Sequence, residues 1–70
     1  MYAVQCRVNG LIVDEERCST LTDAWDAIEG RRRLLVAAGA SFIAHESRQL
    51  LVAREIGGWV SVTRIVDTAR

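Results

Sequence analysis

The chain has 70 residues, half of them apolar, and its nine arginines balance nine aspartates and glutamates. That length allows one small α+β domain over residues 1–70, with a core that yields only ~3–5 kcal/mol by itself. A net charge of zero gives no general attraction to nucleic acid, and no apolar run approaches the ~20 residues that a membrane span needs.

The start of the chain predicts a β-hairpin. Residues 2–8 alternate between apolar and polar side chains, which is typical of a strand with one solvated face. Asn9-Gly10 follows, and this pair favours a two-residue type I′ turn because both residues tolerate positive φ. Residues 11–18 then form the second strand, and the charges at 14–17 suit an edge strand, where they oppose unwanted pairing.

The same turn predicts where the two cysteines lie. With Val8 paired to Leu11, Cys6 pairs with Val13, and Cys18 lies far from Cys6 on the other face of the hairpin. An intramolecular disulfide is therefore not expected. Two free thiols and the absence of a signal-peptide pattern in MYAVQCRV indicate a reducing, cytoplasmic location.

One helix should follow, from about Thr22 to Ala38. Thr20 and Asp23 fit a capping box at its start, and Gly39 suits the position just after its end. The side of the helix wheel that is mostly apolar carries Ala24, Trp25, Ile28, Leu35 and Val36. Gly30 is unfavourable in a helix interior, so a kink or break there stays open as an alternative.

The rest of the chain reads as three more strands. These cover Ala40 to Glu46, Leu50 to Ile56 and Trp59 to Val66, and the last two are joined through Gly57-Gly58. The predicted order is ββαβββ. Strands on both sides of a single helix indicate an α+β fold, in which an antiparallel sheet has one helix packed on one face.

The last two strands are apolar on both faces, although a single helix can cover only one face. The uncovered face must therefore meet something else, and we expect it to bind a protein partner or a second copy of the chain. If Gly57-Gly58 is a two-residue turn, one face carries the candidate partner-binding residues Arg54, Ile56, Trp59, Ser61 and Thr63.

The opposite face is smoother, and we favour it as the core. Its apolar residues are Leu51, Ala53, Val60 and Val62. The alternative stays open that the first face is the core and that Trp59 packs on Trp25.

Three consecutive arginines form the one charged run of the chain. Arg31, Arg32 and Arg33, with Arg48, are candidate contacts for nucleic acid or an acidic partner. The alternative is structural, because Arg32 and Arg33 follow Glu29 at the spacing that favours ion pairs on a helix. The three arginines also fan over ~200° of helix, so they do not form one stripe.

No group of residues indicates catalysis. His45 is the sole histidine, and Glu46 beside it points to the other face of a strand. Cys6 and Cys18 lack the local spacing of metal ligands, and the glycines match no phosphate-binding pattern. We therefore expect no enzyme activity, no metal, no cofactor and no small-molecule substrate.

The whole chain resembles small phage-encoded accessory proteins in the order of its elements. This order is a hairpin with the turn Asn9-Gly10, then one helix, then a short antiparallel meander. Anti-CRISPR inhibitors are among these proteins, although no residue motif carries over. The resemblance implies a compact, non-catalytic protein that blocks a larger host complex by surface contact. The chain departs from the acidic members that mimic DNA, because it is neutral. The alternative function is a small nucleic-acid-binding regulator that uses Arg31 to Arg33.

Overall fold

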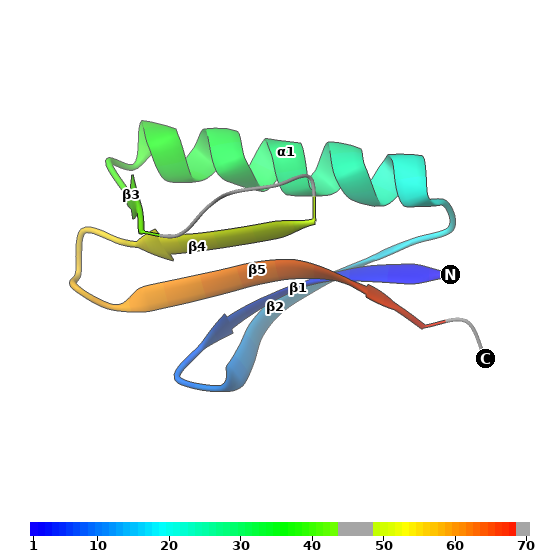
Figure 1. Cartoon of the computed structure of the whole chain (residues 1–70), viewed down its shortest axis with the longest axis horizontal. Coiled ribbons are helices and arrows are strands. Elements are labelled where there is room, and N and C mark those ends of the chain that lie inside the picture. The colour runs from blue at the N-terminus through cyan, green and yellow to red at the C-terminus, as the bar shows by residue number, and fades with distance from the viewer. Residues whose placement is uncertain (44–48, 69–70) are drawn as a thin grey trace.

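The structure is a computed structural model that describes residues 1–43 and 49–68. It has a five-stranded antiparallel sheet, and one helix lies along one side of this sheet (Figure 1). The sheet order is β2-β1-β5-β4-β3. The elements are β1 (Tyr2–Val8), β2 (Leu11–Cys18), α1 (Leu21–Ala37), β3 (Ser41–Phe42), β4 (Leu50–Arg54) and β5 (Val60–Asp67). The predicted α+β fold in the order ββαβββ is confirmed.

The first hairpin has the predicted turn. Asn9 and Gly10 both adopt positive φ, at 54° and 79°, and Val8 pairs with Leu11. These dihedrals give a turn whose twist matches that of the two strands. β2 lies at the edge of the sheet, as its run of charges predicted.

A β-bulge changes the second half of this hairpin. The register shifts between Cys6 and Arg7, so that Cys6 faces Asp14 and Val13 is the extra residue in β2. The predicted pairing of Cys6 with Val13 is wrong for this reason. The bulge also brings Cys18 to the same face as Cys6, contrary to prediction, and both thiols are buried and free.

Helix α1 begins and ends where its sequence signals lie. The hydroxyl of Thr20 accepts a hydrogen bond from the backbone N–H of Asp23 at 3.1 Å. At the other end Gly39, with φ +82°, donates to the carbonyl of Val36, and Ala40 donates to that of Leu35. These bonds form a Schellman motif, which satisfies carbonyls of the last turn. The helix continues through position 30 without a break.

The core lies between α1 and the face of the sheet beneath it, here called the covered face. Ala24, Ile28 and Leu35 supply the buried residues of the helix, whereas Val36 is 55% exposed, contrary to prediction. The sheet supplies Val4, Cys18, Leu51 and Ala53. Beyond α1, β3 covers Ser41–Phe42, and the described residues Ala40 and Ile43 lie outside it, contrary to prediction. Positions 44–48, which held the rest of the predicted strand and most of the polar turn, are outside the described residues.

The connection between β4 and β5 differs from prediction by one residue. Glu55 N–H donates to the Trp59 carbonyl at 2.9 Å, and Gly58 N–H donates to the Glu55 carbonyl at 2.8 Å. The turn is therefore a three-residue loop, with Gly58 at φ +92° in its last position. Arg54 consequently pairs with Val60, not with Ser61, and every side chain of β5 falls on the face opposite to the one predicted.

Candidate functional site

The candidate site is the face of the sheet that is turned away from α1, here called the outer face. No element among the described residues lies across it, because the one helix covers the other side (Figure 1). Side chains alternate along a strand, so the pairing identifies its members. They are Ala3, Gln5, Arg7, Ile12, Glu15, Arg17, Ser41, Leu50, Val52, Arg54, Val60, Val62, Arg64 and Val66.

The centre of the outer face is apolar. Val52 pairs with Val62, Val60 is the next residue of β5 on the same face, and all three are only half-buried. The covered face differs sharply, since Leu51, between Leu50 and Val52 on β4, is 1% exposed. The outer face therefore presents an aliphatic patch that the described part of the chain leaves incompletely buried.

Arginines lie beside this aliphatic patch, since Arg7 pairs with Val62, Arg54 pairs with Val60, and Arg64 follows Val62 on the same face. With Arg17, which lies farther away on β2, and one glutamate, they give the outer face a formal charge of +3. Glu15 accepts a hydrogen bond from Gln5 at 3.0 Å, and Gln5 in turn accepts from Arg7 at 3.4 Å. Within the described ranges, Arg54 and Arg64 form no ion pair.

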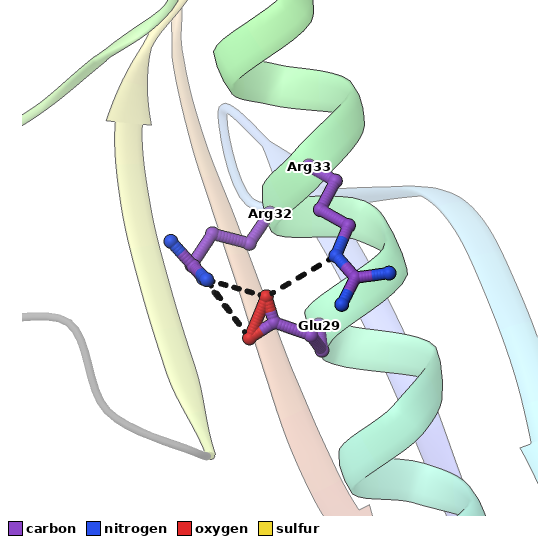
Figure 2. A network of polar contacts seen from close by, with 3 residues as sticks. All are labelled: Glu29, Arg32 and Arg33. Carbon is purple, nitrogen blue, oxygen red and sulfur yellow. Dashed lines mark hydrogen bonds and ion pairs between the residues drawn. The ribbon is translucent and has the colours of Figure 1, made fainter.

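The helix arginines, by contrast, are held by carboxylates of the same chain. Figure 2 shows Glu29 between Arg32 and Arg33, with a hydrogen bond from Arg32 at 3.0 Å and an ion pair to Arg33 at 3.8 Å. The hydrogen bond from Arg32 lowers the pKa of Glu29, and the positive charges of both arginines lower it further. Arg31 instead approaches Glu55 at 3.8 Å. This pairing agrees with the structural alternative for the run.

The five predicted partner-binding residues do not share one face. Ser61 and Thr63 lie on the covered face, and each is 1% exposed, so the prediction that they join Arg54 on an open surface is wrong. Arg54 lies on the outer face. Ile56 and Trp59, at 78% and 48% exposed, lie in and beside the turn.

The residues that the sequence-based prediction missed are Val60, Val62 and Arg64. The signal that could have identified them is the Gly57-Gly58 pair itself. A second glycine with positive φ suits a three-residue loop as well as a two-residue turn. In the three-residue register, these side chains fall on one face with Arg54.

The described residues offer little evidence for a metal site or a reactive cysteine. No three histidine, cysteine, aspartate or glutamate side chains among them are grouped so that they could hold a metal ion. Burial raises the pKa of the Cys18 thiol, and the carboxylates of Glu16 and Asp23 raise it further, which disfavours a reactive thiolate. His45, Glu46 and Arg48 lie outside the described residues.

Comparison with known proteins finds no family model, no curated protein and no solved structure that matches this chain. Across the described ranges, the longest helix is too short and too polar to cross a membrane.

Proposed function

We propose that the protein is a non-catalytic interaction module that docks its outer face onto an acidic protein surface with exposed apolar side chains. The observation that supports this most directly is the combination of the valine patch with Arg54 and Arg64, which form no ion pair among the described residues. Apolar centres ringed by polar groups are common in protein interfaces, and arginine is enriched in them.

The outer face fits a protein better than it fits nucleic acid. Sheet surfaces that bind single-stranded nucleic acid stack bases on aromatic side chains. No member of the outer face is aromatic. Tyr2 and Phe42 pack against the core under the helix, Trp25 lies on α1, and Trp59 lies beside the turn.

The charge of the outer face argues against a second copy as its occupant. Two copies stacked through this face would bring together two surfaces of +3 each. Like charges placed across an interface cost several kcal/mol. A partner with carboxylates around an apolar centre would complement both the positive charge and the aliphatic patch of the outer face.

The outline resemblance to anti-CRISPR inhibitors gives the proposal a narrower form. In that form the partner is a subunit of a host complex, and the outer face blocks it by occupying one of its acidic surfaces. The neutral charge of the chain fits such surface blocking better than it fits mimicry of DNA.

The test compares two single charge reversals. Arg64→Glu changes the middle of the outer face, whereas the matched Arg33→Glu changes a helix side chain that is 79% exposed, where the solvated ion pair with Glu29 contributes little to stability. Wild type and both variants are immobilised and exposed to host lysate, in one half of the experiment without nuclease and in the other half after nuclease treatment. Each retained protein is then purified, and its affinity is measured at several salt concentrations.

The proposal expects an acidic protein that wild type and Arg33→Glu bind equally well. Arg64→Glu should weaken this binding at least about tenfold, and salt should weaken it as well. Three results would contradict the proposal: no directly binding protein, loss of binding in Arg33→Glu alone, or a target that nuclease removes. The last two would favour the nucleic-acid or helix-based alternative.

A further inference from the structure

A cavity of about 300 Å³ lies between α1 and the covered face, beside the edge strand β2. Its size is at the lower end of the range of small-ligand pockets. The helix contributes Ala27, Gly30, Arg31 and Leu34, and the strands contribute Val4, Cys6, Asp14, Glu16 and Thr63. The outer face, to which the proposed function refers, lies on the opposite side of the sheet.

Two buried hydrogen-bonding atoms line the cavity near β1 and β5. Thr63 is 1% exposed, and its hydroxyl has no hydrogen-bond partner among the described residues. The Nε atom of Arg31 is also buried and has no partner there, and the terminal nitrogen of the same side chain donates to the Cys6 sulfur at 3.4 Å. Buried polar groups are normally hydrogen-bonded, so these two are suited to an acceptor on a ligand.

The side of the cavity at β2 carries two carboxylates. Asp14 and Glu16 belong to β2 and are exposed at the edge of the sheet. Asp14 pairs with Cys6, and Cys6 pairs with Thr63, so the three residues form one row across the strands. Two strand spacings of nearly 5 Å separate the ends of this row by about 10 Å.

Gly30 opens the wall of the cavity on the helix side. Glycine is the least favourable helix residue after proline, yet α1 continues through it. A Cβ atom added at this position would meet nothing within 4 Å. A large side chain here could therefore enter the cavity, which makes position 30 useful for a test.

We infer that this cavity binds a small zwitterion, a molecule with a carboxylate and an ammonium group at the two ends of a short aliphatic body. Its carboxylate would accept from Thr63 and from Arg31 Nε, and its ammonium would lie near Asp14 and Glu16. Val4, Ala27 and Leu34 offer the apolar wall for the body. A simple anion would meet the two carboxylates, and a simple cation would leave the buried donors unpaired.

The experiment uses 6-aminohexanoate as the probe, with hexanoate and hexylamine as matched controls that each lack one charged end. Binding to the full chain is measured by NMR titration at millimolar probe concentrations, and the shifts of the amides of Gly30, Cys6 and Thr63 are followed. The zwitterion should bind at least about tenfold more tightly than either control, since each control loses one set of charge-assisted contacts.

Two substitutions locate the binding. Thr63→Val keeps the shape and removes the hydroxyl, and it should weaken binding about tenfold. Ser61→Ala is the control, because Ser61 is equally buried, also has a hydroxyl without a partner among the described residues, and does not line the cavity. Gly30→Leu should abolish binding by filling the cavity.

Three outcomes would overturn the inference: no binding of 6-aminohexanoate, equal binding of the zwitterion and either control, or equal effects of Thr63→Val and Ser61→Ala. If Gly30→Leu does not fold, the comparison of Thr63→Val with Ser61→Ala decides.

Discussion

Replacement of Gly30 by alanine should stabilise the protein. Gly30 lies in the interior of α1, where glycine costs about 1 kcal/mol relative to alanine. The new methyl group would meet no atom within 4 Å, so no clash offsets this gain. For a domain of this size, a gain of about 1 kcal/mol raises Tm by roughly 4–8 °C.

Gly39→Ala gives the matched contrast, because it is the same substitution at the end of the same helix. Gly39 has φ +82°, and a Cβ atom there would lie 3.0 Å from Cδ1 of Ile56. The left-handed conformation alone costs an L-residue about 1–2 kcal/mol. The sign of the effect should therefore reverse, and Tm should fall by several degrees.

Thermal and urea unfolding, followed by circular dichroism at 222 nm, measure both variants under the same conditions. The reasoning is refuted if Gly30→Ala is no more stable than wild type. It is refuted equally if Gly39→Ala unfolds at the wild-type temperature, since the two glycines would then be interchangeable.

Two further predictions concern the ends and the surface of α1. Thr20→Ala removes the acceptor of the Asp23 N–H and should lower the free energy of unfolding by about 1 kcal/mol. Urea unfolding should show this as a lower midpoint with an unchanged slope. Thr22→Ala is the control at an exposed neighbouring position, and a similar loss of stability there would argue against a capping role. The pKa of Glu29 is lower in the folded chain than in the unfolded chain, so its contribution to stability is present above about pH 4.3 and is lost as pH falls through the folded pKa. Glu29→Gln should therefore lose less stability on acidification than wild type in urea unfolding at a series of pH values, and identical pH profiles would contradict this.

The parts of the fold that were predicted correctly depend on local chemistry. Asn9-Gly10 specifies its turn because both residues accept positive φ, and Thr20 and Gly39 specify the two ends of α1 through bonds to neighbouring backbone. Such interactions span only a few residues. They are therefore visible in the sequence without knowledge of the tertiary structure.

The incorrect parts depend on single-residue shifts of register. A bulge at Val13 moves Cys18 to the face of Cys6, and one extra loop residue turns Ser61 and Thr63 under the helix. Each shift exchanges one face of a strand for the other. The hydrophobic pattern could not reveal the extra loop residue before β5. It favoured the apolar residues Val60 and Val62 for the core, whereas Ser61 and Thr63 are the residues buried there.

The candidate site was predicted only in its general position. The two-faced strands indicated an uncovered face, and Arg54 does lie on it. Its other members depended on the register of β5. The pairing of Arg32 and Arg33 with Glu29 was foreseen as one of two alternatives, because it depends on helical spacing alone.

The uneven placement of charge gives this neutral chain an electrical polarity. The outer face carries +3, while α1, the covered face and the β4–β5 turn together carry seven acidic residues and three arginines. Net charge governs migration in an electric field, but a charged resin or partner responds to the nearest surface. Near its isoelectric point of about 6.5, the molecule would hardly migrate, yet it could adhere to a cation exchanger through one side.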